Sequence, residues 1–96
     1  MNINEIITQM GGIEHLKNTV QANFLNDRDA LVFRFQGSPK ANVLKIKLNG
    51  LDLYDMTFYF QGHDPCNLGL QKTGLFKDVY DIQIKEIFNE FTGLHI

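Results

Sequence analysis

Two residues that can bind metals or act in nucleophilic catalysis, His63 and Cys66, stand close together in the sequence. An H-x-x-C spacing can place both side chains on one zinc ion, but a structural zinc site needs four ligands. The other histidines, His15 and His95, lie far away and have no paired spacing. A catalytic Cys–His pair would also need a third group to orient it, and the sequence suggests none. We therefore expect a polar surface loop without metal, and we keep a metal-dependent enzyme at His63 and Cys66 as a third hypothesis.

Positive charge is concentrated in the middle of the chain. Residues 30–51 contain no acidic residue, and they contain the cations Arg34, Lys40, Lys45 and Lys47. Arg34, Lys45 and Lys47 alternate with apolar residues, so paired strands would place all three on one face of a sheet. Such a face could contact phosphates or an acidic protein surface. The alternative is an exposed sheet whose lysines provide solubility and discourage pairing of strand edges.

The carboxylates of Asp52 and Asp55 are close enough in the sequence to suggest acid–base chemistry or metal binding. Residues three apart in a regular strand point to opposite faces, which argues against a shared site. We expect Asp52 to belong to the turn after Asn49-Gly50, and Asp55 to pair across strands with a lysine. Tyr59 should lie on the exposed face beside this charge, as is common at protein–protein contacts.

Motifs of the common enzyme classes are absent from the sequence. It contains no glycine-rich phosphate loop, no G-x-S-x-G elbow, no H-E-x-x-H helix and no C-x-x-C pair. The sequence therefore predicts a protein without enzymatic activity and without a cofactor.

Length and composition indicate one globular domain spanning residues 1–96, because the chain is short and 44% of it is apolar. The net charge of −2 argues against a dedicated nucleic-acid binder but leaves room for a local basic face. A single cysteine cannot form an internal disulfide, which favours a reducing compartment. No apolar run approaches the ~18 residues of a membrane span, and residues 1–10 lack the basic start of an export signal. We expect a soluble cytoplasmic protein with no membrane contact.

The elements that must position these residues follow from hydrophobic periodicity. Apolar residues at helical spacing predict helices over residues 3–10, 13–20 and 79–92. Alternation predicts four strands, over residues 31–36, 43–48, 53–61 and 68–76, the last of them interrupted near Thr73-Gly74. Residues 22–25 offer a further short strand. The expected fold class is α+β, a four-stranded antiparallel sheet with the N-terminal and C-terminal helices packed on one face.

Two segments resemble a family of small proteins encoded by bacterial phages and other mobile elements. The run KANVLKIKLNGLDLYD at residues 40–55 is similar to the family core K-x-N-x-V-x-I-x-L-N-x-x-D-x-Y-D-V-x-F. The ending, from Val79-Tyr80 to Phe88 and then Phe91-Thr92-Gly93-Leu94, is similar to V-Y-x-x-x-L-x-x-I-F-x-x-x-T-G-L. Residues 11–12 and 29–31 also fall where members carry G-G and D-N-A-L. The resemblance covers most of the chain, departs at residues 62–70, and transfers no functional residue.

The resemblance implies a non-enzymatic accessory protein that binds and inhibits a host defence protein. Small acidic proteins of phage accessory regions often resemble such inhibitors, including anti-CRISPR proteins, which act by stoichiometric binding. The expected partner is a CRISPR effector nuclease, bound through the exposed sheet face or through the loop at His63–Cys66. The strand pattern, and not the resemblance, supplies the expected partner-binding residues: Arg34, Lys45, Lys47 and Tyr59. The alternative function is contact with RNA or DNA through the cationic sheet face. The sequence leaves the oligomeric state open.

Overall fold

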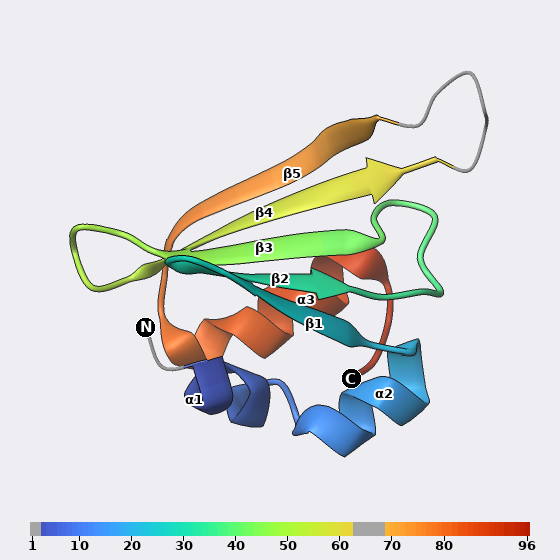
Figure 1. Cartoon of the computed structure of the whole chain (residues 1–96), viewed down its shortest axis with the longest axis horizontal. Coiled ribbons are helices and arrows are strands. Elements are labelled where there is room, and N and C mark those ends of the chain that lie inside the picture. Colours follow the sequence, from blue (N-terminus) through green and yellow to red (C-terminus); the bar gives the residue numbers. More distant parts are fainter. Residues whose placement is uncertain (1–2, 63–68) are drawn as a thin grey trace.

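The computed structural model describes residues 3–62 and 69–96. It is an α+β fold with N-terminal helices, an antiparallel sheet and a C-terminal helix (Figure 1). In chain order, the elements are α1 (Ile3–Gln9), α2 (Ile13–Val20), β1 (Asn23–Asp27), β2 (Ala30–Arg34), β3 (Val43–Leu48), β4 (Tyr54–Gln61), β5 (Leu70–Val79), a 3₁₀ turn (Asp81–Gln83) and α3 (Ile84–Thr92).

The sheet has five strands in the order β1-β2-β3-β4-β5, each antiparallel to the next. The prediction of four strands is therefore wrong, because β1 adds a fifth at the edge. The sequence offers residues 22–25 only as a further short strand outside the predicted sheet, because the segment is short and polar at Asn23 and Asn26 and its alternation is weak. Pairing of Phe24 with Phe33 on β2 fixes its register, and the two rings stack with centroids 5.0 Å apart.

The last strand and the last helix also differ from the prediction. Strand β5 continues to Val79, which was expected to begin the helix. A 3₁₀ turn then precedes α3, and the Gln83 side chain accepts a hydrogen bond from the Tyr80 backbone N–H at 3.0 Å. Tyr80 falls within the predicted helix of residues 79–92, but it lies before α3 and is 58% exposed.

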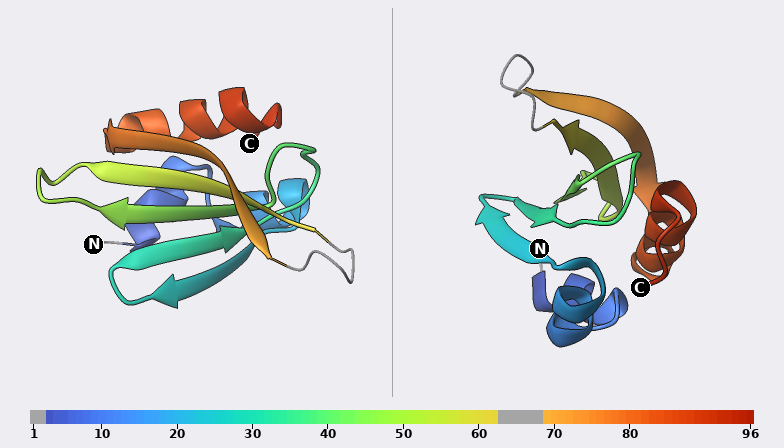
Figure 2. Two further views of the ribbon diagram at one scale, coloured as in Figure 1. Left: turned by 90° about the horizontal axis from the view of Figure 1, so that it is seen from above. Right: turned by 90° about the vertical axis from the view of Figure 1, so that its right-hand side faces the viewer.

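All three α-helices lie on one side of the sheet (Figure 1). Figure 2 shows in its left panel the strands in front of α1 and α2, with α3 along the β5 side. The core between these layers is rich in aromatic rings. Phe88 of α3 packs against Phe33 of β2 and Phe58 of β4, with ring centroids 5.6 and 6.3 Å away. These ring contacts cover the sheet face that points toward the helices, which we call the inner face.

One glycine sets how closely α3 approaches β5. A Cβ atom at Gly74 would lie 2.7 Å from Cε1 of Phe91, so only glycine leaves room for this ring. Phe91 therefore stacks on Phe58 with a centroid distance of 4.4 Å, and it meets Phe76 edge-on. Among the described residues, no helix is long and apolar enough to cross a membrane.

Candidate functional site

The sheet surface that faces away from the helices is here called the outer face. Strand register brings the three predicted cations together on it, because Arg34 pairs with Val43, and Lys45 with Val32. Lys47 pairs with Ala30 and lies two residues after Lys45 on β3, so its side chain is on the same face. No helix of the described ranges, 3–62 and 69–96, lies on this side of the sheet (Figures 1 and 2). The outer face is thus a surface of strands that presents charged side chains.

The three cations differ in exposure. Arg34 and Lys47 are exposed, whereas Lys45 is half-buried. The neighbours of Lys45 across the strands are Val32 and Thr57, which carry no charge. Lys45 therefore lies between two neutral side chains in the sheet.

Tyr59 lies on the same face, since it also pairs with Val43, and its side chain is half-buried. Its neighbour on β5 is Lys72, an exposed cation that sequence reasoning missed. An irregularity between Phe58 and Tyr59 shifts the register: Phe58 pairs with Gly74, but Tyr59 pairs with Lys72. The extra residue, Thr73, breaks the period of two on which the prediction depended. A glycine inside a strand pattern was the one signal for this bulge.

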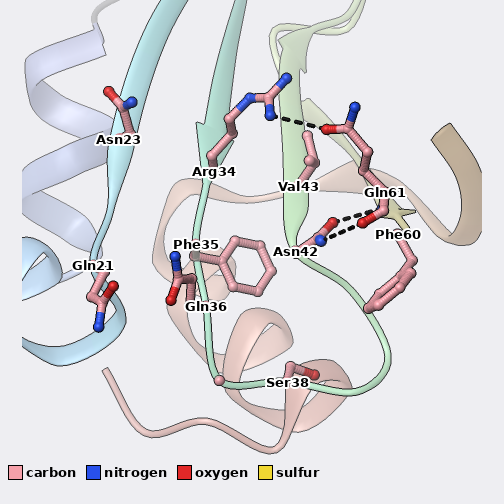
Figure 3. Close-up of a pocket in the computed structure, with 11 residues that line it drawn as sticks. Gln21, Asn23, Arg34, Phe35, Gln36, Ser38, Asn42, Val43, Phe60 and Gln61 are labelled. Carbon is pink, nitrogen blue, oxygen red and sulfur yellow. Dashed lines mark hydrogen bonds between the residues drawn. The ribbon is translucent and has the colours of Figure 1, made fainter. Parts of the chain in front are cut away.

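A hollow of about 510 Å³ opens where β1 begins and β2 ends. Figure 3 shows Arg34 reaching across it, and its guanidinium donates a hydrogen bond to Oε1 of Gln61 at 2.9 Å. The side chain of Asn42 makes two hydrogen bonds with the backbone of Gln61: its Nδ2 donates to the carbonyl oxygen at 2.9 Å, and its Oδ1 accepts from the N–H at 2.8 Å. These bonds join the segment before the start of β3 to the end of β4. The amides of Gln21, Asn23 and Gln36 complete much of the polar lining. The described residues that line it supply amide, hydroxyl and guanidinium groups, and none of them is His, Cys, Asp or Glu.

A second hollow of about 380 Å³ lies beside the turn between β1 and β2. Its lining residues are Arg28, Asp29, Ala30, Lys45 and Lys47. We call it the basic hollow, because three of the five described residues that line it are cations and one is an acid. Two of the predicted partner-binding residues thus line one depression of the surface.

The carboxylates of Asp52 and Asp55 do not form a joint site. Asp52 lies in the turn between β3 and β4 with a φ of 59°. Asp55 lies in β4, where its Oδ1 accepts hydrogen bonds from Nδ2 of Asn49 at 3.1 Å and from the backbone N–H of Asp78 at 3.2 Å. Lys47 is the cross-strand partner of Asp55 in register, as expected. The Asp55 carboxylate itself makes its hydrogen bonds to Asn49 and to the Asp78 backbone.

Asn49 organises this end of the sheet. Its Oδ1 accepts hydrogen bonds from the backbone N–H groups of Leu51 and Leu53, and its Nδ2 also donates to Asp78 at 2.8 Å. The predicted hairpin at Asn49-Gly50 is present, but the left-handed residue of the turn is Asp52. The asparagine side chain therefore stabilises the turn.

His63 and Cys66, on which the metal hypothesis depends, lie outside the described residues. Within residues 3–62 and 69–96, no group of three or more His, Cys, Asp or Glu side chains could hold a metal ion.

Comparisons with protein-family models, with curated proteins and with solved structures found no match to this chain.

Proposed function

We propose that this chain is a non-enzymatic binding protein whose outer face contacts an acidic surface of a protein partner. The observation that carries this proposal is the shared face of Arg34, Lys45 and Lys47, on a side of the sheet without a described helix. Positive charge gathers there although the whole chain has a net charge of −2. Local complementarity of this kind directs association toward partners of opposite charge.

The composition of the outer face favours a protein over a nucleic acid. Tyr59 and Arg34 belong to the residue types that are enriched at protein interfaces. Apolar side chains share the outer face with the cations: Val43 lies between Arg34 and Tyr59 in register, and the 43% exposed Leu75 lies on β5. Phosphate recognition alone would favour a denser set of cations.

The resemblance to small phage-encoded proteins supports a host defence protein as the partner, in the bacterial cytoplasm. A CRISPR effector nuclease fits this proposal. The chain would inhibit it by occupying the surface stoichiometrically, which requires no catalytic residue.

The test is inhibition of a purified effector nuclease by the full chain and by two matched double variants. Lys45→Glu/Lys47→Glu reverses charge on the outer face, and Lys17→Glu/Lys85→Glu reverses the same charge at exposed positions on the helices. We expect one-to-one inhibition by the wild type and the helix variant, and loss of binding by the outer-face variant. Equal binding by both variants would overturn the proposed surface.

Contact with RNA or DNA is the second candidate, and the spacing of the cations along the strands favours it. Lys45 and Lys47 are two residues apart on β3, which places their Cα atoms about 7 Å apart in a row that a charged backbone could follow. Nucleic-acid binding should weaken steeply as salt rises. Binding to a protein through apolar and charged groups together should respond far less. A salt titration of binding to the purified effector nuclease and to a single-stranded oligonucleotide therefore separates the two functions.

A further inference from the structure

The side-chain amide of Asn49 has different neighbours at its two ends. Its Nδ2 donates hydrogen bonds to Oδ1 of Asp78 at 2.8 Å and to Oδ1 of Asp55 at 3.1 Å. Its Oδ1 accepts hydrogen bonds from the backbone N–H groups of Leu51 and Leu53, at 2.8 and 3.2 Å. An amide suits this place because it carries a donor at one end and an acceptor at the other.

The next residue, Gly50, makes the Asn49 amide chemically labile. The backbone nitrogen of a glycine after asparagine can attack Cγ of the asparagine, because no side chain shields that nitrogen. A new C–N bond then closes a succinimide ring, and the amide nitrogen leaves as ammonia with the proton of the attacking nitrogen. Water opens the ring and leaves a carboxylate at residue 49, as aspartate or isoaspartate.

The turn between β3 and β4 does not require glycine at position 50. The left-handed residue of this turn is Asp52, with a φ of 59°, and not Gly50. A Cβ atom at Gly50 would meet nothing within 4 Å. Alanine at this position should therefore keep the turn while it shields the attacking nitrogen.

The folded chain opposes the reaction at Asn49. Ring closure joins Cγ to the Gly50 nitrogen and expels Nδ2, so the two hydrogen bonds of Nδ2 to carboxylates must break. Hydrogen bonds to charged groups are stronger than those between neutral groups. The unfolded chain lacks these contacts, and we therefore expect the amide to react when this end of the sheet opens.

Conversion of Asn49 to aspartate would replace the donor Nδ2 by a carboxylate oxygen. That oxygen would occupy the place of Nδ2, which lies 2.8 Å from Oδ1 of Asp78 and 3.1 Å from Oδ1 of Asp55. The three carboxylates would lose the donor that now joins the aspartates, and like charges so close together repel one another. Because Asn49 connects the β3–β4 turn to β5, this repulsion would loosen that end of the sheet.

We propose that Asn49 is a modification site at which deamidation acts as a one-way switch on the stability of the chain. The fold protects the amide while the sheet is closed, and conversion during an opening leaves a sheet end that closes less tightly. This inference stands apart from the proposed binding function, because the chemistry needs only this chain and water.

The first experiment measures loss of the Asn49 amide by mass spectrometry of proteolytic peptides, in mildly alkaline buffer with and without denaturing urea. We expect the folded wild type to react at least about tenfold more slowly than the unfolded chain. Gly50→Ala should fold as the wild type does and should slow the reaction in urea. Equal rates in the folded and unfolded wild type, or an unreactive unfolded chain, would contradict the inference.

The second experiment measures the effect of the new charge by urea unfolding. Asn49→Asp reproduces the aspartate product and should raise the unfolding equilibrium constant about tenfold or more. Asn49→Asp/Asp78→Asn restores a donor next to the new carboxylate, and asparagine tolerates the left-handed φ of 56° at position 78. This double variant should recover part of the lost stability. Asn4→Asp adds the same charge at an exposed position of α1 and should unfold as the wild type does.

The double variant decides the matter even where Asn49→Asp alone does not fold. Its recovery of a folded state would show that charge repulsion at residue 49 causes the loss. A double variant no more stable than Asn49→Asp would defeat the proposed switch, and so would wild-type stability of Asn49→Asp.

Discussion

At the scale of single residues, the phenol of Tyr54 in β4 is affected by the charge of Glu5 in α1 and of Asp81 in the 3₁₀ turn. Burial raises the pKa of its phenol above the ordinary value of 10.0, and the nearby charges of Glu5 and Asp81 raise it further. Above pH 10 the unfolded chain therefore loses this proton before the folded chain does. The folded state then binds more protons than the unfolded state, so the free energy of unfolding should fall as the pH rises above 10. Urea unfolding of the wild type and of Tyr54→Phe across that range measures the effect. The variant has no phenol to ionise at this position, so it should lose less stability, and an identical decline in both proteins would contradict the assignment.

The predictability of the site also differs from residue to residue. Arg34, Lys45 and Lys47 could be placed on one face from the sequence, because each stands between apolar residues and the strands there are regular. Lys72 could not, since the extra residue Thr73 reverses the faces of β5 relative to a simple count. The basic hollow was also beyond prediction, because Arg28 comes from a turn whose approach to β3 depends on the pairing of three strands.

At the scale of elements, the packing of α3 on β5 depends on a glycine that accepts an aromatic ring. Gly74→Ala would place a methyl group 2.7 Å from Phe91, whose ring is held by Phe58 and Phe76 and has little room to shift. We expect the substitution to lower the free energy of unfolding by about 1–3 kcal/mol, as overpacking does. Gly50→Ala is the matched control, since its added methyl would meet nothing within 4 Å. In a Phe91→Leu background the cost of Gly74→Ala should shrink, because the ring that clashes is gone. An unchanged cost in that background would show that backbone conformation, and not the ring, requires glycine.

Element boundaries show where sequence patterns lose information. The helices and the three central strands follow from clear periodicity, since Phe33, Ile46 and Phe58 each alternate with outward residues. Strand β1 has five residues and exposes Leu25, so pairing with β2 and not its own pattern makes it a strand. The extension of β5 to Val79 likewise depends on its bonding to β4, which a sequence pattern cannot display.

At the scale of the whole molecule, the chain separates an apolar inner face from a cationic outer face on the same strands. Lys45 and Lys47 lie on one side of β3, while Leu44 and Ile46 lie on the other and are fully buried. This arrangement explains how a protein with a net negative charge can present a positive surface. Substitutions on the outer face should therefore have little effect on core packing, because successive side chains of a strand point to opposite faces and contact different neighbours.

Because the two faces of β3 differ in burial, two double variants at alternate positions of this strand should behave in opposite ways. Lys45→Glu/Lys47→Glu should fold and unfold with the wild-type dependence on urea, because surface substitutions change stability by only about 0.5 kcal/mol each. A small additional loss is expected where the new Glu at position 47 faces Asp55, since like charges across strands repel. Leu44→Glu/Ile46→Glu makes the same number of charged substitutions one position away, and it should prevent folding because two carboxylates would be buried without partners. Circular dichroism and urea titration of both proteins decide the matter. Unfolding of the lysine variant, or a folded leucine–isoleucine variant, would mean that the faces of β3 are assigned the wrong way round.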